Sequence, residues 1–77
     1  MTVELTDNEK YSIIQQHLRN VNYNKYNLEI SLIEENAATP KSQQNIDSLT
    51  VQLNNINAKI SALQAEMDNL NPTDTNI

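Results

Sequence analysis

The chain contains no cysteine and no glycine, and it has no tryptophan. Without cysteine, disulfides and cysteine-based zinc sites are excluded. Without glycine, the loops that cradle phosphate groups and the tightest glycine turns are excluded as well. A single histidine, His17, leaves little for any other structural metal site. This composition is typical of long helices joined by short loops.

Basic residues are also scarce, because five Lys and Arg stand against ten Asp and Glu, for a net charge of −5. Nucleic acids and anionic membranes bind clustered basic faces, so neither is expected as a partner. No apolar run approaches the roughly 18 residues that span a bilayer. The first ten residues, MTVELTDNEK, lack the basic-then-apolar layout of a signal peptide. We therefore expect a cytoplasmic protein.

The length of 77 residues allows one small domain, residues 1–77, with a large surface for its volume. The segment TDNE at 6–9 matches a capping box, in which Thr6 and Glu9 each serve the other's backbone amide. Asp7 and Glu9 also favour a helix start, because the amino end of a helix attracts negative charge. Nothing in the following residues breaks a helix, which predicts one over about 7–38.

The segment Thr39-Pro40 interrupts this pattern and predicts a turn at 39–41. Proline disfavours a helical conformation in the residue before it and fits the first turn of a new helix. Either Thr39 or Ser42 can cap that helix, which is expected over about 42–70. Asn71-Pro72 stops the helix, and we expect a disordered tail at 71–77. Two helices of similar length with a short joint must lie antiparallel.

The second helix has apolar residues at both core positions, a and d, of four heptads, spaced 3-4-3-4-3-4-3. These residues are Ile46, Leu49, Leu53, Ile56, Ile60, Leu63, Met67 and Leu70. The first helix has a weaker row of the same period. That row is Tyr11, Ile14, Leu18, Val21, Lys25, Leu28 and Leu32. The two rows together, called the seam below, predict an all-α fold, an antiparallel two-helix coiled-coil hairpin.

The seam also predicts the register of the two helices. In an antiparallel pair each a layer lies level with a d layer of the other helix. Pairs such as Leu28 with Leu53 and Ile14 with Met67 have residue numbers that add to 81 throughout. This sum puts the fold-back centre between Pro40 and Lys41, where the proline independently predicts the turn.

The first helix carries a second apolar row, called the stripe below, at positions b and f. It consists of Tyr23, Tyr26, Ile30, Ile33 and Ala37. A helix that is apolar on two nearly opposite sides requires neighbours on both. We therefore expect a homo-oligomer that meets through the stripe, with a two-fold dimer forming a four-helix bundle first and a trimer second. Smaller apolar residues on the second helix, Val51, Ala58, Ala62 and Ala65, are equally compatible with close helix packing and with ordinary surface.

The remaining polar residues do not form a catalytic, cofactor or metal site. His17 falls beside the seam, where we expect it to be exposed. Lys25 occupies an a position, either as a lysine that extends to solvent and pairs with Glu29 or as a determinant of register and oligomer state. Glu34 and Glu35 point about 100° apart, so they do not converge as an acid and base pair, and we expect both to be solvated.

The stretch HLRNVNYNKYNLEISLIEENAATP at 17–40, followed by IDSLTVQLNNINAKISALQAEMDNL at 46–70, resembles small uncharacterised helical-hairpin proteins of marine bacteriophages that infect cyanobacteria. The resemblance lies in composition and order over most of the chain. It implies a viral accessory or structural role, in the host cytoplasm or in the virion, and supplies no active site.

Two functions are consistent with these observations. The first is a non-enzymatic structural or interaction protein that self-associates through the stripe. The second is a regulatory binder that docks its hairpin onto another protein, such as a host enzyme or transcription protein. An enzyme is not expected, since the chain offers no nucleophile with a base and no pocket to hold them.

Overall fold

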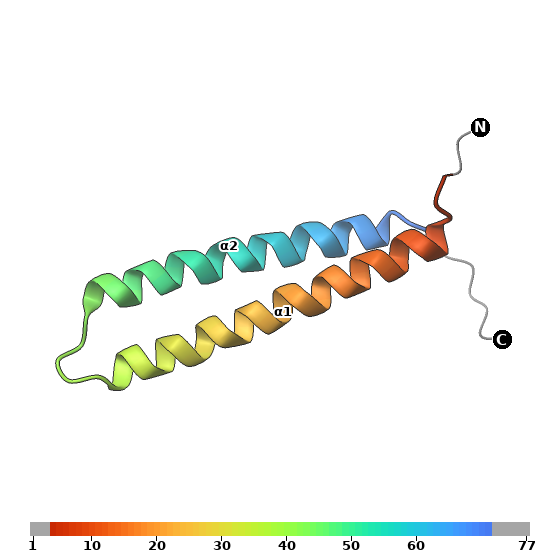
Figure 1. The fold of residues 1–77 in the computed structure, drawn as a ribbon. Helices are drawn as coiled ribbons and strands as arrows, with labels where there is room; N and C mark the ends of the chain where they lie inside the picture. Colours follow the sequence, from red (N-terminus) through yellow and green to blue (C-terminus); the bar gives the residue numbers. More distant parts are fainter. Residues whose placement is uncertain (1–3, 72–77) are drawn as a thin grey trace.

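The computed structural model describes residues 4–71, which form two antiparallel helices (Figure 1). Helix α1 spans Asp7–Ala37 and helix α2 spans Gln43–Asp68. The helices lie side by side along most of their length, in a rod of 59 × 28 × 19 Å. No strand occurs in residues 4–71, so the expected all-α helical hairpin is confirmed. The expected tail lies outside the described residues from Pro72 onward.

The start of α1 is stabilised by the expected capping box. The Glu9 amide donates to the Thr6 hydroxyl at 3.1 Å, and the Thr6 amide donates to the Glu9 carboxylate at 2.8 Å. Asp7 and Glu9 place negative charge in the first turn, where the helix dipole favours it. Two amides without partners inside the helix are thus satisfied by local sequence alone.

The start of α2 is capped by Ser42 and not by Thr39. The Ser42 hydroxyl accepts a hydrogen bond from the Asn45 amide at 3.3 Å, and α2 begins at the next residue. Pro40 therefore lies in the connection between the helices, within the turn expected at 39–41. Packed helix axes lie about 8–10 Å apart, so the chain needs several extended residues to cross between them. A helix beginning at Pro40 would have left only Ala38 and Thr39 between the two helices.

Helix α2 ends at Asp68, two residues before the expected end at Leu70. The Leu70 amide donates to the Met67 carbonyl at 3.1 Å. This bond joins residues three apart, whereas an α-helical bond joins residues four apart, so the last turn is wound more tightly. The next residue, Asn71, precedes a proline and is biased away from the helical conformation. The last turn therefore tightens and stops.

The seam residues are the covered apolar side chains of this hairpin. Ile14 is 9% exposed and is the only buried side chain among residues 4–71. All the other seam residues of both helices, Lys25 included, are half-buried. The radius of gyration is 17.7 Å, against about 11 Å for a compact domain of this length. The two helices therefore share a long strip of contact and have no closed core.

Two hydrogen bonds cross between the helical segments and agree with the expected register. The Asn45 amide group donates to the Glu35 carboxylate at 3.2 Å, and the Asn71 backbone amide donates to the Asp7 carboxylate at 2.8 Å. The residue numbers of these pairs add to 80 and 78, within one helical turn of the expected 81. Individual layers such as Leu28 with Leu53 stay predictions.

The cap at Ser42 generates a stability prediction. We expect Ser42→Ala to lower the free energy of unfolding by about 1 kcal/mol, because the Asn45 amide loses its acceptor. Ser42→Asp should retain most of the stability, since aspartate caps equally well. Ser61→Ala, at an exposed position inside α2, is the matched control and should leave stability unchanged or slightly raised. Urea unfolding followed by circular dichroism at one protein concentration measures all three; equal losses at positions 42 and 61 would contradict the cap.

Candidate functional site: an apolar stripe on α1

The stripe residues remain uncovered in the hairpin. Tyr23 is 72% exposed, Tyr26 is 64%, Ile33 is 63% and Ile30 is 36%. Ala37, at the end of the stripe, is exposed as well. Their spacing of three and four residues puts them in one row, so they form a continuous apolar surface and not scattered points.

The same helix therefore has two apolar sides with different environments. Leu28 and Leu32 are half-buried against α2. Ile30 and Ile33 lie within two residues of them in the sequence but face solvent. Tyrosine combines a large apolar ring with a hydroxyl that tolerates water, and for this reason it is enriched at protein interfaces. The chemistry that such a surface supports is contact with another protein surface.

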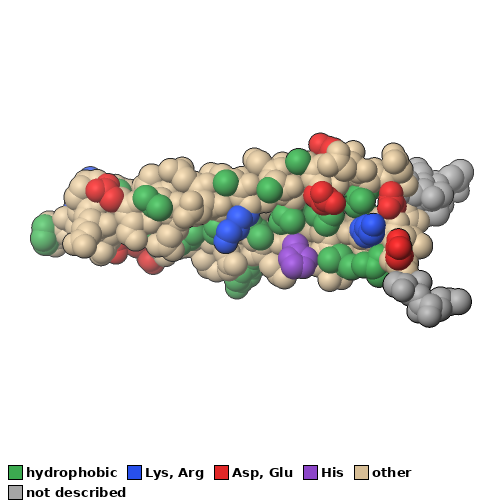
Figure 2. Space-filling view, turned by 90° about the horizontal axis from the view of Figure 1, so that it is seen from above, with side chains coloured by type: hydrophobic (Ala, Val, Ile, Leu, Met, Phe, Trp, Pro, Cys, Tyr) green, Lys and Arg blue, Asp and Glu red, His purple; other side chains and the backbone are tan. Residues whose placement is uncertain are grey.

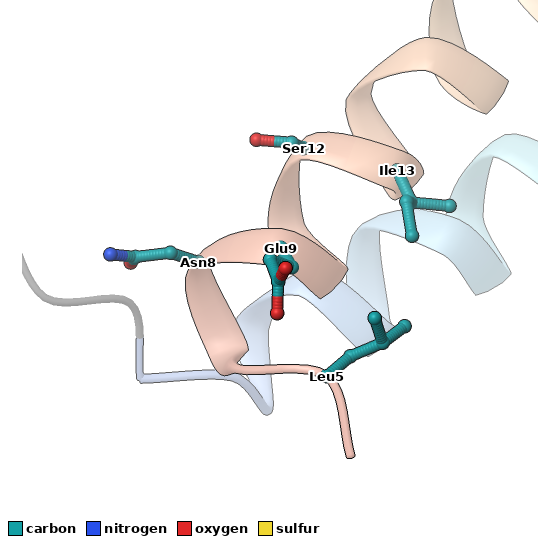
Figure 3. Close-up of a pocket in the computed structure, with 5 residues that line it drawn as sticks. All are labelled: Leu5, Asn8, Glu9, Ser12 and Ile13. Carbon is teal, nitrogen blue, oxygen red and sulfur yellow. The ribbon is translucent and has the colours of Figure 1, made fainter. Parts of the chain in front are cut away.

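A second apolar area lies beside the start of α1 (Figure 3). Five residues line a shallow hollow there, with Leu5 and Ile13 on one side of the helix start and Asn8 and Ser12 on the other; the fifth is Glu9. Leu5 is 50% exposed and Ile13 is 42% exposed. The Glu9 carboxylate at this hollow already accepts the Thr6 amide in the capping box. The hollow therefore presents two apolar side chains, two neutral polar ones and a carboxylate that is already engaged in the helix cap.

The space-filling view shows how the apolar side chains reach the surface (Figure 2). On this face they gather in the half of the rod nearer the chain ends, with charged side chains among them. Because the seam residues other than Ile14 are only half-buried, part of the seam is accessible to solvent. The apolar surface of the hairpin thus includes the edge of the seam in addition to the stripe.

The structure corrects the expectation for one of the two adjacent glutamates. His17 and Glu34 are exposed, as expected, but Glu35 is half-buried and accepts the hydrogen bond from Asn45. Glu35 follows Leu28 by seven residues and so continues the d positions of the seam beyond its last apolar member. Its carboxylate therefore lies between the helices at the loop end.

Asp7 occupies the equivalent d position at the other end of the seam, seven residues before Ile14. It is also half-buried, and its carboxylate accepts the Asn71 amide. The sequence interpretation missed both roles, because it followed the seam only through apolar residues. Extending the heptad by one d position in each direction finds Asp7 and Glu35 directly.

The described residues show no group of three or more His, Asp or Glu side chains that could hold a metal ion. Neither α1 nor α2 is long and apolar enough to cross a membrane. Comparisons with protein-family models, with curated proteins and with solved structures found no match to this chain. The hypotheses for function therefore depend on the surfaces of the hairpin itself.

The bond between Glu35 and Asn45 generates a second prediction. In a double-mutant cycle of Glu35→Ala and Asn45→Ala, we expect a coupling free energy of about 0.5 kcal/mol, because the bond is charge-assisted but accessible to water. The same cycle with Glu34→Ala instead of Glu35→Ala is the matched control and should show no coupling to Asn45. Urea unfolding measures each variant, and equal coupling for both glutamates would contradict the contact.

The half-buried Lys25 generates a third prediction. We expect Lys25→Leu to raise the free energy of unfolding by about 1 kcal/mol, because it adds an apolar side chain to the seam. Lys59→Leu, at an exposed position of α2, is the control and should give no such gain. Light scattering after size exclusion separates the two hypotheses for Lys25: an unchanged molar mass favours a lysine that extends to solvent, and a changed mass favours a determinant of oligomer state.

Proposed function

We propose that this chain is a non-enzymatic interaction protein that self-associates through the stripe on α1. The observation that carries the proposal is the exposure of three large stripe side chains, Tyr23, Tyr26 and Ile33, each by more than 60%. Such a row of large apolar side chains on a regular helix is costly in water unless another surface covers it.

The absence of a closed core in the described residues supports the same proposal. Domains of this size gain little stability from their own burial, and natural ones add disulfides, metals or oligomerisation. Disulfides are excluded because the chain has no cysteine. With Ile14 as the only buried side chain in residues 4–71, covering further apolar surface is the remaining source of stability.

A two-fold dimer is the simplest assembly that covers the stripe of every copy. Closed dimers are the commonest homo-oligomers, and two hairpins that meet through the stripe bring four helices together, with the two copies of α1 at the centre. A trimer is the next candidate. The resemblance to phage hairpin proteins is compatible with a viral structural or accessory role for such an assembly.

The regulatory binder is the second function compatible with the stripe. In that case the exposed tyrosines would contact a different protein, and the chain alone would stay monomeric. No feature of the described residues favours a foreign partner over a second copy, so this function is an outcome of the test below.

The test is the molar mass of the purified chain between about 1 and 100 μM, the range in which small interfaces associate. We expect a concentration-dependent dimer that Ile33→Glu converts to monomer while the circular dichroism of the helices is retained. Val51→Glu, which places the same charge on an exposed apolar position of α2, is the control and should leave the dimer intact.

A wild-type chain that stays monomeric at 100 μM would overturn self-association and leave the regulatory binder. A dimer broken by Val51→Glu and not by Ile33→Glu would place the interface on α2.

A further inference from the structure

The stripe is self-complementary when a second copy runs antiparallel to it. Tyr23 with Ile33 and Tyr26 with Ile30 are pairs whose residue numbers add to the same value, 56. A two-fold axis in line with position 28 therefore places each tyrosine opposite an isoleucine of the other copy. In a two-fold interface residue i must meet residue j while j meets i, and this row satisfies that condition.

On this basis, and resting on the proposed function, we infer that the partner is a second copy whose α1 lies antiparallel across the stripe. A parallel arrangement would place Tyr23 beside Tyr23 and Ile33 beside Ile33. It would also bring together like charges, because the charges of α1 are unevenly distributed along it.

After its capping turn, α1 carries all its basic residues before its acidic ones. The basic residues are Lys10, Arg19 and Lys25, and the acidic ones are Glu29, Glu34 and Glu35. Arg19 precedes Tyr23 by four residues and continues the line of the stripe, while Glu34 borders the stripe beside Ile33. Both are exposed.

In the antiparallel dimer Arg19 lies level with position 37 of the other copy. Glu34 of that copy is then about 4.5 Å away along the helix, within reach of an arginine side chain. The two-fold axis generates this pair twice. The acidic residues of the capping turn, Asp7 and Glu9, fall beyond the end of the other α1 and take no part.

The exposed area of the stripe fits a weak dimer. If a large side chain fully exposed offers about 200 Å², the exposed fractions of Tyr23, Tyr26, Ile30 and Ile33 add to roughly 500 Å² per copy. Two copies then bury on the order of 1,000 Å², the lower limit for a biological interface. We therefore expect a dissociation constant in the micromolar range.

The first experiment uses disulfide trapping, which is clean because the chain has no cysteine of its own. Equal amounts of a Tyr23→Cys variant and an Ile33→Cys variant, distinguished by mass, are mixed and oxidised mildly. We expect mainly the mixed disulfide between position 23 of one copy and position 33 of the other. Identical positions lie ten residues, or about 15 Å, apart along the axis, too far for a disulfide.

Disulfides mainly between identical positions would overturn the antiparallel arrangement in favour of a parallel one. Random pairing, or no disulfide from a chain that light scattering shows to be dimeric, would overturn it while leaving self-association in place. A wild-type chain that stays monomeric at 100 μM would overturn both this inference and the proposed function.

The second experiment tests the charge pair by sedimentation equilibrium. We expect Arg19→Glu or Glu34→Arg alone to raise the dissociation constant roughly tenfold, because two attractions become repulsions, and the double variant to return within about threefold of wild type. Lys10→Glu makes the same charge change beyond the interface and is the matched control. Additive effects of the two changes, without recovery in the double variant, would overturn the pairing of Arg19 with Glu34.

Discussion

The strip of half-buried side chains between α1 and α2 is the contact on which the rest of the hairpin depends. It runs along both helices but is narrow, so it leaves Ile14 9% exposed and covers the other members only in part. Most of the stability of a helix in a protein comes from packing of its apolar face and not from intrinsic helix propensity. Each helix therefore relies on the other, and the pair relies on covering more of its surface.

The ends of the helices are determined by polar groups and not by the seam. Thr6 and Glu9 begin α1, and Ser42 begins α2, each through a side-chain oxygen placed at a backbone amide. The chain turns without glycine: residues 38–40 form a bend, and Ala38 and Ser42 on either side of the turn have extended backbone angles. Local capping and the long-range seam thus agree on one register, which is the consistency expected of a sequence that specifies one fold.

Periodicity was sufficient to predict the two helices, the seam and the turn, because apolar spacing reports directly which side of a helix is covered. It was insufficient where a polar residue occupies a covered position. Glu35 and Asp7 continue the heptad, yet an acidic side chain there looks like surface until the position of Asn45 or Asn71 is known. The choice of Ser42 over Thr39 likewise depended on the distance between helices, which no local pattern contains. The stripe could be predicted from the sequence, but the surface that covers it belongs to a second molecule and could not.

The hydrogen bond between Asn71 and Asp7 affects which part of this hairpin opens first. A pair of helices joined by one loop normally frays from the opposite end, where nothing links the two segments. Here that end is joined by the Asn71 amide on the Asp7 carboxylate, while the loop joins the other. The least apolar layer, at Lys25, lies between them. For small motions the two helices are therefore linked at both ends of the hairpin, and slow hydrogen exchange should extend to the last turn of α2 and leave the layer around Lys25 as the first to open.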